Sequence, residues 1–319
     1  MVFTASWRGI LRRTARSVTH QLQTRSLTTP SIRERLLRDG AVWPVPVLSA
    51  SEASTLRTDL VIAISGRGGF ANSDLLYYKA HLMFSAVDAL ARHPTIIHAA
   101  QSALATDDLL LWDSSVPLKP PTCDVSDADG GGHFPWHQDA TYWGLEPVNG
   151  ALSCWVALSD ASEAHGCMRV VRGSHAGGQR DHALRPGEDG SMLRRGQQVV
   201  GVDDEDAEAM ALRAGEMSLH HPLALHCSGP NTTREARVGV VLVFVPPSTV
   251  PHGGRGSATL VAGRCDASHW ALSPACWWPA TNLGAAAADD PEALAVHAEA
   301  LALHRGELQA TLKGEGRDG

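Results

Sequence analysis

A histidine and an aspartate stand two residues apart at His137 and Asp139, and a third side chain that can bind a metal, His226, follows far downstream. On a β-strand, side chains two residues apart leave the same face, so His137 and Asp139 can point at one ion. Two imidazoles and one carboxylate occupy one face of an octahedral metal and leave three positions open, as in non-haem Fe(II) oxygenases. The three residues therefore predict an oxygen-activating iron centre.

The segment after His226 supplies groups that suit an organic acid. Ser228 shares a strand face with His226, and its hydroxyl can donate a hydrogen bond to a carboxylate. Arg237 follows His226 by eleven residues and has a planar fork that matches a carboxylate in a bidentate pair. A tight turn at 229–233 predicts a hairpin, which lets Arg237 point into the same cavity as His226. The pattern predicts that a 2-oxo acid cosubstrate binds beside the metal.

A framework of short strands must position these residues. Apolar runs typical of strands occur at 109–112, 151–158, 168–171 and 238–246. The last run is rich in β-branched residues, which is typical of a central strand. Residues 36–108 are expected to be mostly helical, and a helix with proline at its first position is expected over 291–303. The pattern favours a mainly β fold, with a jelly-roll core, an N-terminal helical layer and a C-terminal helix.

Together these motifs resemble the phytanoyl-CoA dioxygenase (PhyH) family of Fe(II)/2-oxoglutarate oxygenases. The similarity runs from about residue 79 to about residue 245 and is carried by the segments 136–139, 155–158, 166–175 and 215–237. The resemblance implies a double-stranded β-helix of the cupin-like kind, with iron held by His137, Asp139 and His226. It also implies that Arg237 and Ser228 grip 2-oxoglutarate, with Trp155 and Lys79 as further contacts.

The resemblance further implies a reaction in which 2-oxoglutarate and O₂ are cosubstrates, ascorbate is supportive, and succinate and CO₂ are released. Similar halogenases have Ala or Gly in place of Asp139 and bind chloride there, so the carboxylate favours hydroxylation of an aliphatic or acyl-type small molecule. Two alternatives stay open: a natural-product oxygenase that desaturates or cyclises its substrate, and a non-catalytic metal-binding jelly roll. The substrate itself is not predicted, because its contacts are expected from the variable loops at 66–78, 118–133 and 176–209.

The N-terminus differs in charge from the rest of the chain. Residues 1–33 contain six arginines and no acidic residue, so without them the formal charge falls from −7 to −13. Apolar residues recur among these arginines at helical spacing, which is typical of a mitochondrial or plastid presequence. We therefore expect a targeting segment over 1–35 and one dioxygenase domain over 36–319; the alternative is a disordered arm on a cytoplasmic protein. A fluorescent fusion to residues 1–35 tests mitochondrial import, and a diffuse cytosolic signal would contradict it.

The composition of the chain excludes several classes of binding partner. The net charge of −7 argues against nucleic-acid binding, and no long uncharged apolar run predicts a membrane span. The six cysteines lie without a C-x-x-C pair, which favours reduced thiols over disulfides or a zinc site. A small molecule is the expected partner, and the oligomeric state is not predicted. Of the adjacent His220 and His221, only one can face the cavity from a strand; a structural role is the first interpretation, and a contact of His221 with the substrate or a metal ligand is the alternative.

Overall fold

The computed structural model describes residues 30–65, 78–121, 132–184, 191–193, 197–274 and 291–314. The expectations for the arginine-rich segment 1–29, and for Cys123 and Cys276, lie outside the described residues. The helices are α2 (Ile32–Asp39), α3 (Ala50–Ser65), α5 (Ala80–Met83), α6 (Ser85–Ala91), α7 (Pro94–Leu104) and α8 (Pro291–Gly314). The 3₁₀ turns within the described residues are η2 (Asp139–Tyr142), η3 (Ser174–Gly177) and η4 (Asp204–Asp206).

Two sheets, antiparallel except for the parallel pair of β15 with β16, carry the site. The larger sheet has the order β1-β11-β6-β13-β2-β15-β16, with β3 also paired to β13. Its strands are β1 (Ala41–Pro46), β11 (Glu216–His220), β6 (Leu152–Ala157), β13 (Arg237–Val245), β2 (Leu109–Ser115), β15 (Gly256–Ala262), β16 (Trp270–Leu272) and β3 (Leu118–Lys119). The smaller sheet, of order β10-β7-β12-β4, comprises β10 (Ala207–Met210), β7 (Met168–Val171), β12 (His226–Ser228) and β4 (Phe134–His137). The short pairs β14 (Val250–Pro251) with β5 (Leu145–Glu146) and β8 (Ala183–Leu184) with β9 (Gln197–Gln198) complete the described strands.

Alternation along the strands of the larger sheet separates its core face from its cavity face. On β13, Val240, Leu242 and Phe244 join a core cluster that also contains residues of α2, α3, α6 and α7. Since neighbouring side chains in a strand point to opposite faces, Arg237 and Val241 point the other way and line a cavity. The strand predicted at 238–246 is confirmed as central, because β13 pairs with β6 on one side and β2 on the other.

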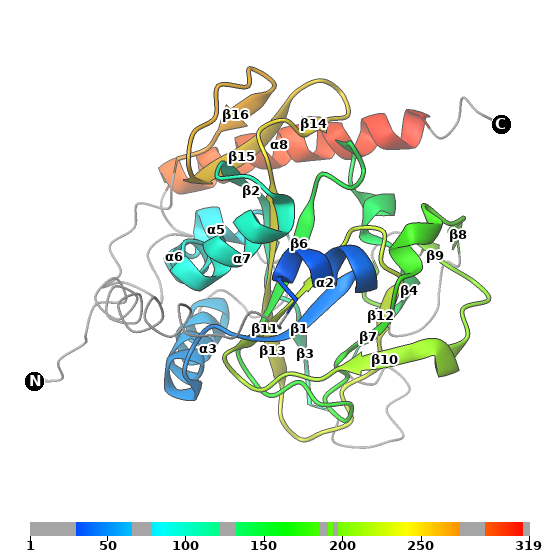
Figure 1. Cartoon of the computed structure of the whole chain (residues 1–319). Coiled ribbons are helices and arrows are strands. Elements are labelled where there is room, and N and C mark those ends of the chain that lie inside the picture. The colour runs from blue at the N-terminus through cyan, green and yellow to red at the C-terminus, as the bar shows by residue number, and fades with distance from the viewer. Residues whose placement is uncertain are drawn as a thin grey trace, which may run out of the picture.

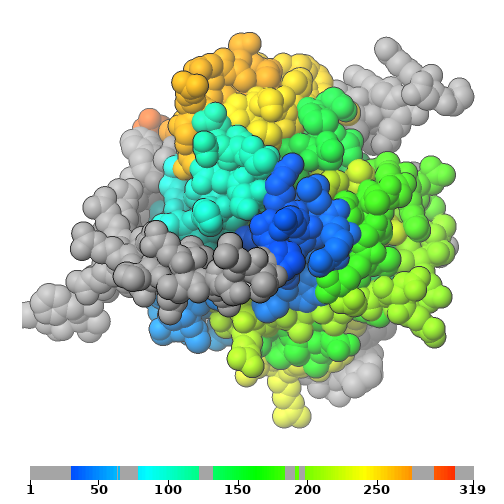
Figure 2. Space-filling model, in the orientation of Figure 1, coloured from blue at the N-terminus to red at the C-terminus, as the bar shows by residue number. Residues whose placement is uncertain are grey.

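The helices cover the core face of this sheet. Figure 1 shows α2, α3, α5, α6 and α7 gathered on one side of the strands, with α8 crossing near β15. In the space-filling view of Figure 2, the blue N-terminal segment lies between the cyan helical segment and the green strand-rich segment. The predicted N-terminal helical layer and C-terminal helix are therefore present. The helical share is larger than the mainly β prediction allowed, and the fold is mixed α/β with several sheets.

One strand was missed within the region expected to be mostly helical. Helix α2 ends at Gly40, whose φ of 75° suits a residue without a Cβ, and β1 begins at the next residue. Strand β1 contains Pro44 and Pro46, which discourage a strand prediction. Proline is tolerated here because β1 is the edge of the sheet and pairs only with β11.

Candidate active site

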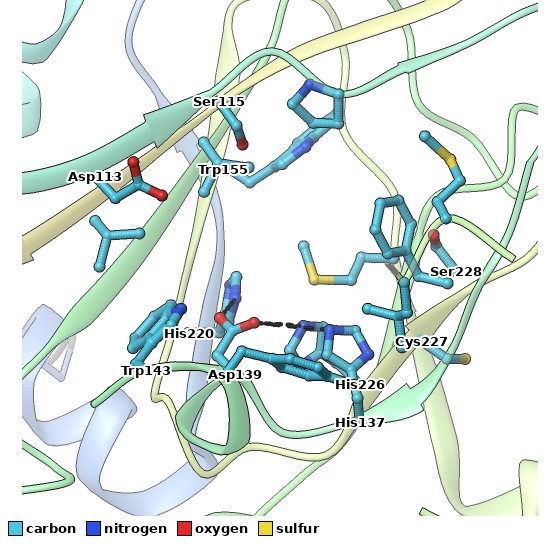
Figure 3. A pocket seen from close by; sticks show the side chains of 18 of the residues that line it. Asp113, Ser115, His137, Asp139, Trp143, Trp155, His220, His226, Cys227 and Ser228 are labelled. Carbon is cyan, nitrogen blue, oxygen red and sulfur yellow. Dashed lines mark hydrogen bonds and ion pairs between the residues drawn. The ribbon is translucent and has the colours of Figure 1, made fainter. Parts of the chain in front are cut away.

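The inner faces of both sheets line one cavity of ≈ 260 Å³. The larger sheet contributes side chains from β2, β6, β11 and β13, and the smaller sheet contributes them from β4, β7 and β12. Figure 3 shows these side chains converging from opposite walls. The cavity therefore lies between the two sheets, where residues distant in sequence meet.

The three expected metal ligands meet at one end of the cavity. Strands β12 and β4 pair so that His226 lies opposite His137, and the centroids of their rings are 4.1 Å apart. The Oδ1 atom of Asp139 is 3.7 Å from the Nε2 atom of each histidine. One ligand atom from each residue lies within 4.8 Å of the others, a spacing that could hold a metal ion. The predicted convergence of the three residues is confirmed.

The route by which Asp139 reaches the site differs from the prediction. Strand β4 ends at His137, and Asp139 is the first residue of η2, so strand alternation does not place it. The intervening Gln138 is buried and anchors the turn. Its amide nitrogen donates to the carbonyls of Gly178 and Leu223, and its amide oxygen accepts from the backbone N–H of Arg180. A fixed turn, rather than an extended strand, brings the carboxylate back beside His137.

Backbone hydrogen bonds orient both imidazoles. The Nδ1–H of His137 donates to the carbonyl of Pro135 at 2.8 Å, and that of His226 donates to the carbonyl of Ala224 at 2.9 Å. The two Nε2 atoms are then left as electron-pair donors that face Asp139. Burial and the nearby His137 lower the pKa of His226 to about 3, so this ring is neutral at physiological pH. Two neutral nitrogens and one carboxylate oxygen fit a ferrous ion.

The carboxylate of Asp139 is held through its second oxygen. Ser153 Oγ donates to Oδ2 at 2.8 Å, and His220 Nε2 donates to the same atom at 3.1 Å. Burial alone would raise the pKa of Asp139, but the nearby His226, and after it His137 and His220, hold that pKa well below its usual range. The carboxylate is therefore ionised, and Oδ1 remains for a metal.

One of the two adjacent histidines faces the cavity. His220, not His221, lines the cavity and contacts Asp139. The side chain of His221 instead accepts a hydrogen bond from the backbone N–H of Leu223, and its ring lies 5.0 Å from that of His175. The alternation of side chains along β11 does not by itself show whether His220 or His221 faces the cavity. The pairing of β11 with β6 sets the register that turns Ser218 and His220 inward.

Arg237, Ser228 and Trp155 all line the cavity, as expected. The guanidinium carbon of Arg237 lies 5.2 Å from the ring centroid of Trp155, close enough for a cation–π contact. Gly239 makes room for this indole, since a Cβ there would come within 2.3 Å of Trp155. One guanidinium nitrogen of Arg237 donates to the carbonyl of Gly166, whereas its buried Nε–H has no partner in the described structure. A buried cation with an unused donor fits an anion that enters the cavity.

A buried lysine beside Ser228 and Arg237 was not predicted from the sequence. Lys119 is fully buried on β3, and its ammonium donates to Ser228 Oγ at 2.7 Å. It also reaches the carbonyls of Gly166, Ser228 and Gly229. Strand β3 pairs Lys119 with Arg237, so a lysine and an arginine lie side by side at the Ser228 end of the cavity. Lysines are usually exposed, and only the pairing of β3 with β13 reveals this one.

Lys79 lies elsewhere. Its side chain is buried, and its ammonium donates to the carbonyls of Trp112 and Ser257. The neighbouring Tyr78 lines the cavity, but Lys79 is not among the lining residues. A contact between Lys79 and the cosubstrate stays a prediction, to which this geometry adds no support.

The fold and the site match those of the class of non-haem iron oxygenases that use 2-oxoglutarate. The model of the phytanoyl-CoA dioxygenase (PhyH) family matches residues 79–239, about half of the sequence, and the chain belongs to this family. No described helix is long and apolar enough to cross a membrane.

Individual relatives support the assignment. The apo structure of the non-heme monooxygenase ThoJ is 30% identical, with a TM-score of 0.72, and the match covers 89% of this chain and 100% of that one. A probable alpha-ketoglutarate-dependent hypophosphite dioxygenase of Stutzerimonas stutzeri is 29% identical over 192 residues, 58% of this chain and 63% of that protein. The peroxisomal phytanoyl-CoA dioxygenase of Homo sapiens is 27% identical over 111 residues, 34% of this chain and 32% of that protein. The chain thus spans less than two thirds of either curated relative.

Proposed function

We propose that this protein hydroxylates an aliphatic or acyl-type small molecule in a reaction that consumes 2-oxoglutarate and O₂ and releases succinate and CO₂. The observation that carries the proposal is the meeting of the His137, Asp139 and His226 group with Arg237 and Ser228 in one cavity. A metal-storage protein would need the first group alone. Two separate groups in one cavity suit a cosubstrate that chelates the metal at one end and pairs with Arg237 at the other.

Each residue has a distinct part. His137, Asp139 and His226 would hold Fe(II), which together with 2-oxoglutarate supplies the power to oxidise a C–H bond with O₂. Arg237 would pair with the far carboxylate of 2-oxoglutarate, and Trp155 keeps its guanidinium in place. Because Lys119 donates to Ser228 Oγ, the hydroxyl hydrogen of Ser228 is left to donate to the same carboxylate. Asp139 occupies the third protein position at the metal, which favours hydroxylation.

The test uses the purified full chain. With Fe(II), ascorbate, 2-oxoglutarate and O₂ we expect slow formation of succinate and CO₂ in equal amounts, and none when Fe(II) is omitted. Anaerobic calorimetry with Mn(II) in place of Fe(II) should show metal-dependent binding of 2-oxoglutarate. Metal binding without any affinity for 2-oxoglutarate would instead support a non-catalytic jelly roll. A screen of metabolites for stimulated succinate release would then identify the substrate.

Because of Lys119, binding of 2-oxoglutarate is expected to be accompanied by uptake of a proton. Burial and the nearby Arg237 lower the pKa of Lys119 to about 6, although its oxygen partners favour the ammonium. A carboxylate bound at Ser228 stabilises the charged form and raises that pKa, so binding above pH 6 takes up a proton. At pH 7.5 we expect uptake approaching about one proton per 2-oxoglutarate, measured by calorimetry in buffers of different ionisation enthalpy. The uptake should vanish in Lys119→Met, and heats independent of buffer in the wild type would contradict the role of Lys119.

A further inference from the structure

The cavity has a second polar end that the cosubstrate does not use. In Figure 3, Ser228 lies on one side of the metal-binding residues, whereas Asp113 and Trp143 lie on the other. All three side chains line the same cavity. If 2-oxoglutarate extends from the metal toward Ser228, the space beside Asp113 and Trp143 is where the primary substrate can approach the metal.

Asp113 brings a negative charge into this space. It lies on β2 opposite Val243 of β13, on the cavity face of the larger sheet, and is half-buried. Its Oδ1 accepts a hydrogen bond of 2.8 Å from the backbone N–H of Lys79. No described residue donates to its Oδ2 or forms an ion pair with it. One carboxylate oxygen is therefore available to a ligand.

Aromatic side chains line the same cavity as this carboxylate. Trp143, Tyr78 and His304 line the cavity, the last from helix α8. They form a connected group with Trp112 behind them. Ring centroids are 5.6 Å apart for Trp112 and Trp143, 4.9 Å for Trp112 and His304, and 5.3 Å for Tyr78 and His304. A carboxylate and aromatic faces in one cavity together have the chemistry that recognises an organic cation.

The charges of the loaded site lead to the same conclusion. Ferrous iron and Arg237 would together balance Asp139 and the two carboxylates of 2-oxoglutarate. The proton that Lys119 is expected to take up lies behind Ser228, at the cosubstrate end of the cavity. Arg237 is the only lysine or arginine among the described lining residues and belongs to the Ser228 end, so no described lining cation pairs with Asp113. The ammonium of Lys79 is held outside the cavity by the carbonyls of Trp112 and Ser257. An anionic substrate would meet repulsion from Asp113, and a cationic one would meet attraction.

We propose that the primary substrate carries a protonated or quaternary amine that binds Asp113 against Trp143. The amine then fixes an adjacent aliphatic carbon beside the metal site. The inference rests on the proposed function, and it adds the chemical class of the molecule that is oxidised. It makes Asp113 the specificity-determining residue of the cavity.

The test compares three probes of nearly equal shape: 3-methylbutylammonium, 3-methylbutan-1-ol and 4-methylpentanoate. Mn(II)-loaded full-length protein is titrated with each probe in the absence of O₂, with and without 2-oxoglutarate. Broadening of the probe's proton resonances by Mn(II) reports both affinity and closeness to the metal. We expect the ammonium to bind at least about tenfold more tightly than the alcohol, which corresponds to one charge-assisted contact, and the carboxylate to bind most weakly.

Variants separate charge from shape. Asp113→Asn keeps an acceptor for the backbone N–H of Lys79 and should remove the preference for the ammonium. Asp107→Asn changes an exposed aspartate ahead of the same strand and should retain the preference. Trp143→Leu should weaken binding of the ammonium more than that of the alcohol. Equal binding of ammonium and alcohol by the wild type, or an undiminished preference in Asp113→Asn, overturns the inference. The preference for the ammonium is also measured without 2-oxoglutarate, so it can be tested independently of cosubstrate binding. A protein that keeps this preference but does not bind 2-oxoglutarate would contradict the proposed function and leave the inference intact.

Discussion

Replacement of Asp139 by alanine is expected to reduce the formation of succinate by more than about 100-fold, a larger loss than removal of an outer hydrogen-bond partner of a metal ligand causes. The substitution removes the only anionic ligand and leaves two neutral imidazoles, which hold a divalent ion weakly. It also leaves the hydrogen bonds from Ser153 and His220 without their acceptor. Steady-state succinate release and Fe(II) affinity, measured together, separate loss of metal from loss of chemistry.

Two further variants serve as comparisons for Asp139→Ala. Ser153→Ala removes one hydrogen bond to Asp139 Oδ2 but keeps the ligand, so a loss of about 10-fold is expected. Asp206→Ala changes an exposed aspartate of η4 and should retain wild-type rates. Thermal unfolding of the metal-free proteins checks that each variant is folded. Succinate formation by Asp139→Ala within about threefold of the wild type would show that iron is not held by this carboxylate.

The metal ligands could be predicted from the sequence because the spacing of His137 and Asp139 and the donor set that iron needs pointed to the same site. Asp139 and His137 are close in the chain, so any local turn or strand keeps them near each other. His226 was distant, and its place depended on the donor set that iron needs rather than on any local signal. The strand geometry assumed for Asp139 was nevertheless wrong, because the hydrogen bonds of Gln138 to distant backbone close the turn. Those partners have no signature in the local sequence.

The residues that support the ligands were not predictable in the same way. Ser153, His220 and Lys119 acquire their roles from strand pairing, which brings β6, β11 and β3 around the cavity. The local sequence around a serine, histidine or lysine does not show which residues of another strand will lie opposite it. The same holds for β1, where two prolines argued against a strand that pairs with β11. Register, which is set by tertiary contacts, decided each case.

Replacement of Arg237 by glutamine is the second large effect, and it should act on the cosubstrate rather than on the metal. Arg237 is buried at 3% exposure, and burial lowers its pKa only to about 10, so it is charged at neutral pH. Loss of its charge-assisted pair with a carboxylate costs about 2–3 kcal/mol, which raises the Kd for 2-oxoglutarate roughly 30- to 150-fold. Fe(II) affinity should stay near that of the wild type, because Arg237 does not contact His137, Asp139 or His226.

Two comparisons make this prediction specific. Arg237→Lys keeps the charge but loses the planar fork, so we expect it to recover part of the affinity for 2-oxoglutarate. Arg172→Gln removes a half-exposed arginine that pairs with Asp39 and Glu208, and it should leave the Kd unchanged. Calorimetric titration of each Mn(II)-loaded protein with 2-oxoglutarate gives the Kd directly. Binding by Arg237→Gln as tight as by the wild type would place the far carboxylate elsewhere in the cavity. Equal loss of Fe(II) binding would instead show that the substitution disturbs the wall between Gly166 and Trp155, which Arg237 contacts on both sides.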